Sequence, residues 1–155
     1  MNKPWLSQYG DIPAEINIHQ FTSIAAIYEA SFARYPERPP AMTLETTLRY
    51  TEVKNYSEQV GAWLQQRGLQ KGDRVAVMMP NCLQYVVAVA AILRAGFCVV
   101  NVNPLYTTDE LAHQLKDSGA KAIFILDNFA VTLEHALPHL PDMQHIIVSK
   151  MGDLL

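Results

Sequence analysis

The chain has 155 residues, of which 50% are hydrophobic and 17% charged, a composition that excludes intrinsic disorder and fits one domain or part of a larger one. Twelve lysines and arginines against 15 aspartates and glutamates give a net charge of -3, spread along the chain, so no nucleic-acid partner is expected.

The longest apolar run, residues 85–93, is about half of the roughly 20 residues that a membrane-spanning helix needs. Pro4 and Pro13 interrupt the segment where an export signal would lie, so we expect a cytoplasmic protein. Cys82 and Cys98 lie in apolar sequence without metal-binding spacing and are expected to be reduced packing thiols.

The N-terminal part of the chain is predicted to form an arm, residues 1–20, followed by a helix. Residues 22–35 carry apolar side chains at helical spacing, and Pro36 ends that helix. The apolar side chains of the arm could pack on its own domain, which we favour, on a partner subunit or at a membrane surface. They are Trp5, Leu6, Tyr9 and Ile12.

A hairpin and a second helix are predicted next. Residues 41–44 and 48–50 form two short strands at a sheet edge, and residues 46–47 turn the chain between them. Thr51 is the predicted N-cap of the helix that follows, and Gly68 supplies the left-handed residue just past its end.

From residue 73 onward the sequence repeats one unit of strand, helix and glycine. The predicted strands are residues 73–79, 97–103, 122–126 and 145–149, and the helices between them are residues 82–95, 107–118 and 128–137. Gly96 and Gly119 are expected just past two of these helices with positive φ, and Thr107 with Glu110 forms a capping box. The alternation implies an α/β fold, a doubly wound and mostly parallel sheet with helices on both faces. Because the sequence stops directly after a predicted strand, we expect this sheet to be incomplete and the chain to be a fragment of a longer protein.

No residue is assigned a catalytic, cofactor-binding or metal-binding role. His135 and His139 stand at the i, i+4 spacing of metal ligands, next to Glu134. Pro138 ends the helix between them, which favours a solvated helix end over a metal site. His113 is expected on an exposed helix face.

The carboxyl ends of the predicted strands carry the best candidates for ligand contacts, since open α/β sheets bind ligands there. Asn101, Asn103 and Tyr106 surround the end of one strand, although turn and helix-packing roles are favoured for them. Asp127 ends another strand, and a helix N-cap is favoured over a functional carboxylate. His145 begins a strand and has no evident chemical partner. The sequence contains neither G-x-G-x-x-G nor a P-loop, and no nucleophile and base are paired.

Several stretches together resemble one family. Residues 48–85, in which a G-D-x-V strand leads to a P-N turn, resemble the opening segment of the AMP-forming acyl-adenylate and acyl-CoA synthetases. Residues 93–124, with an L-x-A-G turn, an N-P-x-Y-T stretch and an E-L helix, resemble the next segment. Residues 4–16 and 145–153 further resemble the bacterial long-chain fatty acid-CoA ligases. The match covers nearly the whole chain, and its specificity lies in the order and spacing of the motifs.

The resemblance implies the start of a larger acyl-adenylate-forming domain, with residues 1–20 as an N-terminal arm and residues 21–155 as the first part of the AMP-binding domain. Such enzymes join a long-chain fatty acid to CoA through an acyl-adenylate, use ATP, Mg2+ and CoA, and release AMP and pyrophosphate. The family's phosphate loop, ribose-binding Asp and catalytic Lys are not among these residues, so we expect an inactive scaffold fragment that binds no cofactor alone. Peripheral contact with the inner face of the membrane and a homodimer stay open.

The alternative is a stand-alone binding module of flavodoxin-like or other Rossmann-like type. A flavin phosphate would need backbone N–H donors in the loop after the first predicted strand, and Pro80 removes one of them.

Overall fold

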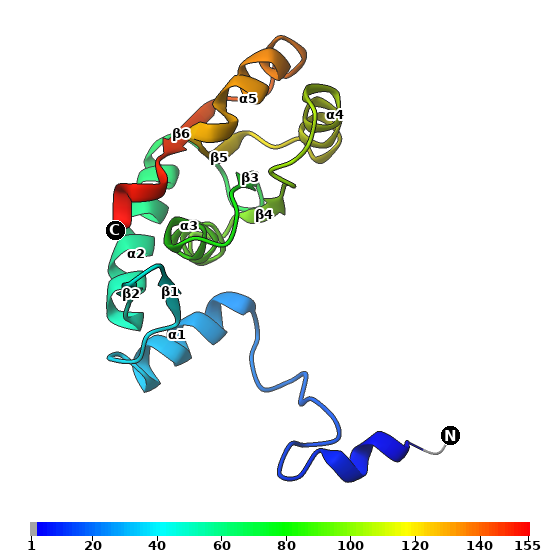
Figure 1. Ribbon diagram of the computed structural model, residues 1–155, viewed down its shortest axis with the longest axis vertical. Coiled ribbons are helices and arrows are strands. Elements are labelled where there is room, and N and C mark those ends of the chain that lie inside the picture. The colour runs from blue at the N-terminus through cyan, green and yellow to red at the C-terminus, as the bar shows by residue number, and fades with distance from the viewer. Residues whose placement is uncertain (1–2) are drawn as a thin grey trace.

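Four strands pair in parallel at the centre of the computed structural model, which describes residues 3–155 (Figure 1). Their order across the sheet is β4-β3-β5-β6, with β4 and β6 at the edges. The strands are β3 (Arg74–Met78), β4 (Cys98–Asn101), β5 (Ala122–Leu126) and β6 (His145–Ser149). The predicted parallel sheet is confirmed.

Helices cover both faces of this sheet. They are α2 (Tyr50–Gln66), α3 (Leu83–Arg94), α4 (Thr108–Ser118) and α5 (Ala130–Ala136). Figure 1 shows α2 and α3 on one side of the sheet and α4 and α5 on the other. Side chains alternate along β3, so Val75 and Val77 pack with α2 and α3, whereas Ala76 and Met78 pack with α4 and α5. The predicted doubly wound α/β fold is therefore confirmed.

The N-terminal elements pack on the side of α3 that faces away from the sheet. They are α1 (Ile24–Arg34), β1 (Ala41–Thr43) and β2 (Thr46–Leu48). Phe32 of α1 and Leu48 of β2 are buried with Leu83 and Val87 of α3 in one apolar cluster. Because α3 is enclosed between this cluster and the sheet, it needs the nearly continuous apolar surface that its sequence has.

The hairpin differs from the predicted one. It forms a separate two-stranded sheet and is not an edge of the main sheet. Its turn consists of Leu44 and Glu45, whereas Thr46 and Thr47, predicted in the turn, belong to β2. Leu44 has a φ of 55°, the left-handed conformation that such two-residue turns favour at Asn, Asp or Gly. A leucine in this position is not recognised from the sequence.

The N-cap of α2 is Arg49, and the prediction of Thr51 is wrong. The backbone N–H of Arg49 donates to the carboxylate of Glu52 over 2.8 Å. The hydroxyl of Thr51 instead donates to the carbonyl oxygen of Pro36 over 2.6 Å, which ties the start of α2 to the loop after α1. The predicted end of the helix is confirmed, since Gly68 has a φ of 89°.

The predicted ends of α3 and α4 are also confirmed. Gly96 follows α3 with a φ of 88°, and Gly119 follows α4 with a φ of 61°. At the start of α4, the backbone N–H of Thr107 donates to the Glu110 carboxylate (2.8 Å), and the Glu110 N–H donates to the Thr107 hydroxyl (3.4 Å). The hydrogen bonds from the Thr107 backbone and hydroxyl hold the pKa of Glu110 below its usual range.

The two cysteines differ in burial. Cys82 is buried in the core between the sheet and α2 and α3, as predicted. Cys98 is exposed, so the prediction of an apolar environment is wrong there. The reason is that Cys98 is the first residue of an edge strand.

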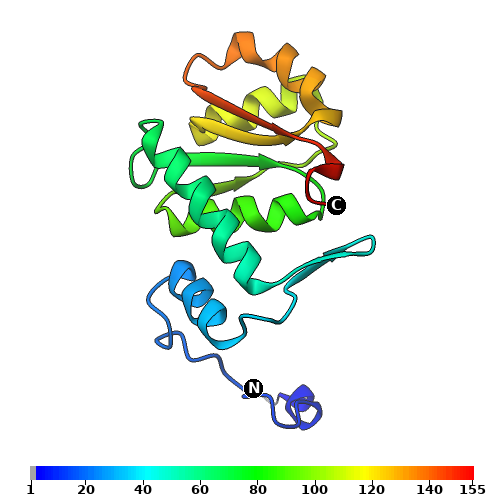
Figure 2. The same ribbon diagram turned by 90° about the vertical axis from the view of Figure 1, so that its left-hand side faces the viewer.

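The N-terminal arm extends away from the rest of the molecule (Figures 1 and 2). It contains a 3-10 helix, Pro4–Gln8, that has no buried residue. Trp5 and Ile12 are exposed, so the prediction that the arm packs on its own domain is wrong. The helix of the arm ends at Gln8, and Gly10, with a φ of 56°, and Pro13 interrupt the segment that follows, so the apolar side chains of residues 5–16 do not form one continuous face. Within residues 3–155, no helix is long and apolar enough to cross a membrane.

Candidate functional site

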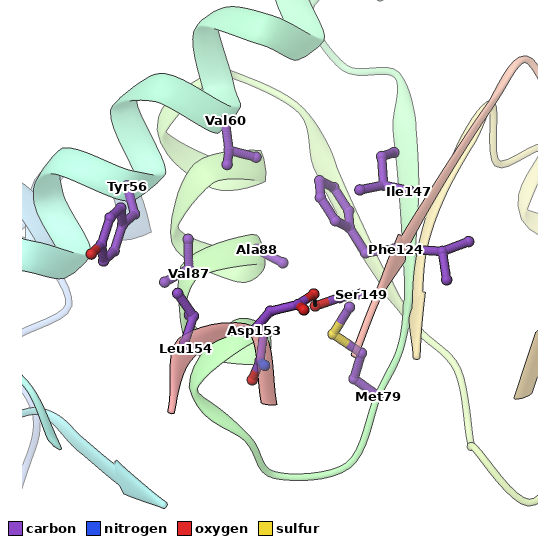
Figure 3. A pocket seen from close by; sticks show the side chains of 12 residues that line it. Tyr56, Val60, Met79, Val87, Ala88, Phe124, Ile147, Ser149, Asp153 and Leu154 are labelled. Carbon is purple, nitrogen blue, oxygen red and sulfur yellow. Dashed lines mark hydrogen bonds between the residues drawn. The ribbon is translucent and has the colours of Figure 1, made fainter. Parts of the chain in front are cut away.

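An apolar groove lies between α2 and the strands β5 and β6 (Figure 3). It consists of two adjoining hollows of about 250 and about 270 Å³ that share Val60, Phe124 and Ile147. We call it the α2–β6 groove and define it by these three residues with Tyr56 and Trp63 of α2. Because α2 and β6 are far apart in the chain, no local sequence pattern indicates this surface.

One end of the groove is polar. The side-chain amide of Gln84, on α3, donates to the carbonyl oxygens of Lys150 (2.8 Å) and Met151 (3.0 Å). The carboxylate of Asp153 accepts from the Lys150 backbone N–H (2.8 Å) and the Ser149 hydroxyl (3.0 Å), and these bonds lower the pKa of Asp153. Gln84 therefore holds the 3-10 turn after β6 against the start of α3, and Asp153 closes that turn on itself.

The side chains at the end of β4 have structural roles, as favoured from the sequence. The Tyr85 hydroxyl donates to the Asn101 side chain over 3.1 Å. The Asn103 side chain accepts from the Leu105 backbone N–H over 3.0 Å, which forms an Asx turn. Tyr106 packs against the apolar cluster beneath α4.

The histidines are dispersed over the structure. His135 lies in α5, whereas Pro138 and His139 lie in the separate 3-10 turn Leu137–His139. His113 is exposed on α4, as predicted. Among residues 3–155, no three His, Cys, Asp or Glu side chains gather in a way that could hold a metal ion.

His145 begins β6 and Asp127 directly follows β5, as predicted, but the contacts of both side chains differ from those expected from the sequence. The His145 ring nitrogen Nε2 lies 3.1 Å from the carbonyl oxygen of Arg67, and the ring meets Trp63 edge-on at 6.1 Å. This contact fastens the start of β6 to the end of α2. Asp127 is exposed and makes no side-chain cap, and Leu126 occupies the N-cap position of the 3-10 turn that precedes α5. The N-cap prediction for Asp127 is wrong because the chain enters α5 through that turn.

Arg94, which sequence reasoning missed, joins the three N-terminal helices. Its Nε donates to the Glu29 carboxylate of α1 over 2.6 Å. Its Nη1 donates to the Ser57 hydroxyl (2.6 Å) and the Lys54 carbonyl oxygen (2.9 Å) of α2. The guanidinium also lies 5.0 Å from the centre of the Phe32 ring. These contacts place a mostly buried cation in a structural role.

Asp73, in the G-D-x-V stretch, likewise has a structural role. Its carboxylate lies 2.8 Å from the Lys121 ammonium and accepts the Gln70 backbone N–H over 2.7 Å. These hydrogen bonds, first that from Lys121, hold the pKa of Asp73 below its usual range. The pair joins the start of β3 to the start of β5. Asp73, Gln84, Arg94 and Asp153 are thus engaged in ties within and between elements, and the lining shared by the two hollows of the α2–β6 groove is apolar.

The sequence matches the family model of the AMP-binding enzymes over residues 28–154. The long-chain-fatty-acid–CoA ligase of Escherichia coli O157:H7 is 50% identical over 157 aligned residues, which cover 100% of this chain and 28% of that protein. The ligase of the same name from Bacillus subtilis (strain 168) is 42% identical over 81% of this chain and 22% of that protein. The chain thus spans about 28% of the length of the E. coli relative and matches its N-terminal part.

Solved structures show the same fold. An anthranilate CoA ligase, AuaEII, in complex with anthranoyl-AMP superposes with a TM-score of 0.79 at 22% identity, over 83% of this chain and 25% of that one. A luciferase-like enzyme from the mealworm Zophobas morio superposes with a TM-score of 0.80 at 21% identity, over 90% of this chain and 35% of that one. The sequence matches favour the acyl-adenylate-forming family over a stand-alone flavodoxin-like module. The chain belongs to the family of AMP-binding enzymes.

Proposed function

We propose that this chain is the N-terminal part of an ATP-dependent long-chain fatty acid–CoA ligase. Residues 21–155 would form the first part of its AMP-binding domain and residues 1–20 an N-terminal arm. The observation that carries the proposal is the 50% identity to the Escherichia coli ligase over the full length of this chain. The substrates would be a long-chain fatty acid, ATP and CoA, and the products acyl-CoA, AMP and pyrophosphate.

The proposed reaction places strong demands on an active site. In the first step the fatty acid carboxylate attacks the α-phosphorus of ATP, and pyrophosphate leaves. In the second step the CoA thiol attacks the acyl carbon, and AMP leaves. Both steps develop negative charge that fixed N–H donors and cations must stabilise. The side chains of Asp73, Gln84, Arg94 and Asp153 are already bonded within the fold, so we propose a scaffold role for this segment and catalytic groups elsewhere in the ligase.

Magnesium belongs to the proposed reaction, where it would neutralise phosphate charge. The residues described here do not fit such a site, since carboxylates do not gather among residues 3–155. We therefore assign no Mg2+ ligand among residues 3–155.

We further propose that the ligase is cytoplasmic and that its arm contacts the inner face of the membrane. The exposed Trp5, Ile12 and Ile16 support this proposal, because aromatic and aliphatic side chains on a projecting segment insert into the interfacial region of a bilayer. Co-sedimentation with phospholipid vesicles, with and without residues 1–20, tests it. Binding that does not change on deletion would overturn the membrane role, and deletion that instead dissociates a homodimer would assign the arm to a partner subunit.

Fatty-acid-dependent exchange of labelled pyrophosphate into ATP tests the main proposal. It should be measured on the whole gene product and, in parallel, on residues 1–155. We expect a gene product that is longer than these residues to catalyse the exchange. Residues 1–155 alone should catalyse none. A folded whole gene product that catalyses no exchange with any long-chain fatty acid would overturn the ligase assignment.

A further inference from the structure

The α2–β6 groove leaves large apolar side chains open to solvent. Tyr56 is 38% and Trp63 36% exposed, although Leu64 of the same helix is fully buried. Beside them, β6 is an edge strand that pairs with β5 alone among the described residues. The backbone groups on its outer side are therefore available for pairing. An apolar hollow next to an open sheet edge is typical of an interaction surface.

The lining of the groove indicates what kind of surface it fits. Val60, Phe124 and Ile147, shared by both hollows, are all apolar. A small ligand would need a few free polar groups to fix its orientation. The polar groups at the end of the groove do not offer this, because Gln84 and Asp153 are bonded to backbone groups and a neighbouring hydroxyl. A charged partner would need complementary charge, and the lining offers little. An apolar protein surface fits best.

We propose that another part of the same polypeptide, an apolar face of the ligase outside residues 1–155, packs into the α2–β6 groove. This inference rests on the proposed function, since only a longer ligase chain supplies that face. The length of the relatives supports it, because this chain matches 28% of the Escherichia coli ligase and most of that protein lies outside the match. Packing there would bury Tyr56 and Trp63 and cover the open side of β6.

Thiol labelling of the whole gene product tests this proposal. Tyr56→Cys and, separately, Trp63→Cys report on the groove, and Val131→Cys is the control because Val131 is exposed on α5, across the sheet. All three variants carry Cys98→Ser, which removes the exposed native thiol. Each folded variant is labelled with a maleimide and compared with its urea-unfolded form. We expect labelling at 56 and 63 to be slower than in the unfolded form by about tenfold or more, since a covered thiol reacts only after local opening.

Two outcomes would overturn the proposal. One is labelling at position 56 and position 63 of the folded protein as fast as in the unfolded form. The other is protection that disappears when the protein is diluted, which would identify a second copy as the occupant. Pyrophosphate exchange measured on the same samples separates this inference from the proposed function. Protection without exchange would support the groove's occupant and overturn the ligase activity, whereas exchange without protection would overturn the groove's occupant alone.

Discussion

Replacing Arg94 tests whether the joint between α1, α2 and α3 is a main source of stability. Arg94→Met keeps the aliphatic part of the side chain near Phe32 and removes the guanidinium. Hydrogen bonds from a charged donor contribute about 1.5–3 kcal/mol each, and Arg94 makes two into α2, to Ser57 and Lys54. The lower value of this range applies to each bond, so the two bonds together contribute about 3 kcal/mol. The reason is that, in the variant, Ser57 keeps its own bond to the Lys54 carbonyl oxygen and no buried group is left unpaired. Glu29 is 54% exposed, so its ion pair adds at most about 1 kcal/mol.

We therefore expect Arg94→Met to lower the free energy of unfolding by about 3–4 kcal/mol. The measurement is urea unfolding followed by far-UV circular dichroism, with the slope m unchanged between variants. Arg49→Met is the matched control, because Arg49 also pairs with a glutamate, Glu37, over 3.2 Å, but the two side chains are 62% and 73% exposed. This control should lose at most about 1 kcal/mol. Equal losses in the two variants would refute the reasoning that burial and the two bonds into α2 decide the contribution of Arg94.

Three further predictions concern single positions. Gly119→Ala should lower the free energy of unfolding by about 1–2 kcal/mol, because φ is 61° and the new Cβ would lie 2.7 Å from Nη2 of Arg74. Urea unfolding of the same substitution in an Arg74→Ala background should show a smaller loss. Equal losses in the two backgrounds would contradict the clash. The lowered pKa of Asp73 means that its carboxylate stabilises the fold above the unfolded pKa of about 3.9 and that this contribution is lost as the pH falls through the lower folded pKa. Stability measured from neutral to acidic pH should therefore fall less steeply in Asp73→Asn, and an unchanged profile would contradict the pairing with Lys121. Thr107→Ala should cost about 1 kcal/mol in thermal unfolding and Thr107→Ser much less, since the serine retains the capping hydroxyl; equal costs would exclude that role.

The sheet and most helix ends could be predicted from the sequence because their signals are local. Short apolar segments rich in Val and Ile mark β3, β4, β5 and β6, and glycines with positive φ follow α2, α3 and α4. Thr107 and Glu110 are three residues apart, so their reciprocal bonds are visible as a sequence pattern. The prediction of the hairpin turn was wrong because Leu44 takes a left-handed conformation, which in such turns is typical of Gly, Asn or Asp.

Contacts between distant parts of the chain could not be predicted. Arg94 and Ser57 are 37 residues apart, and His145 and Arg67 are 78 apart, so neither pair leaves a pattern in a single sequence. The α2–β6 groove belongs to the same class, since its lining comes from α2 and from strands at the other end of the chain. The absence of an assigned catalytic residue rests on motifs and on the resemblance, and it stays a prediction.

Alternate side chains of β3 belong to two separate apolar clusters, so their contributions to the free energy of unfolding are separated as well. Val77 and Met78 are neighbours in the chain, but Val77 shares a cluster with Leu64 and Phe124, whereas Met78 belongs to the cluster beneath α4 and α5. Side chains without shared partners contribute additively to stability, and those in one cluster are coupled. The effect of a substitution at Val77 on the free energy of unfolding therefore depends more on which residue stands at position 64, 13 positions earlier, than on the residue at the adjacent position 78. Sequence drift in this protein is expected to proceed as two largely independent sets of compensating changes, one on each side of the sheet.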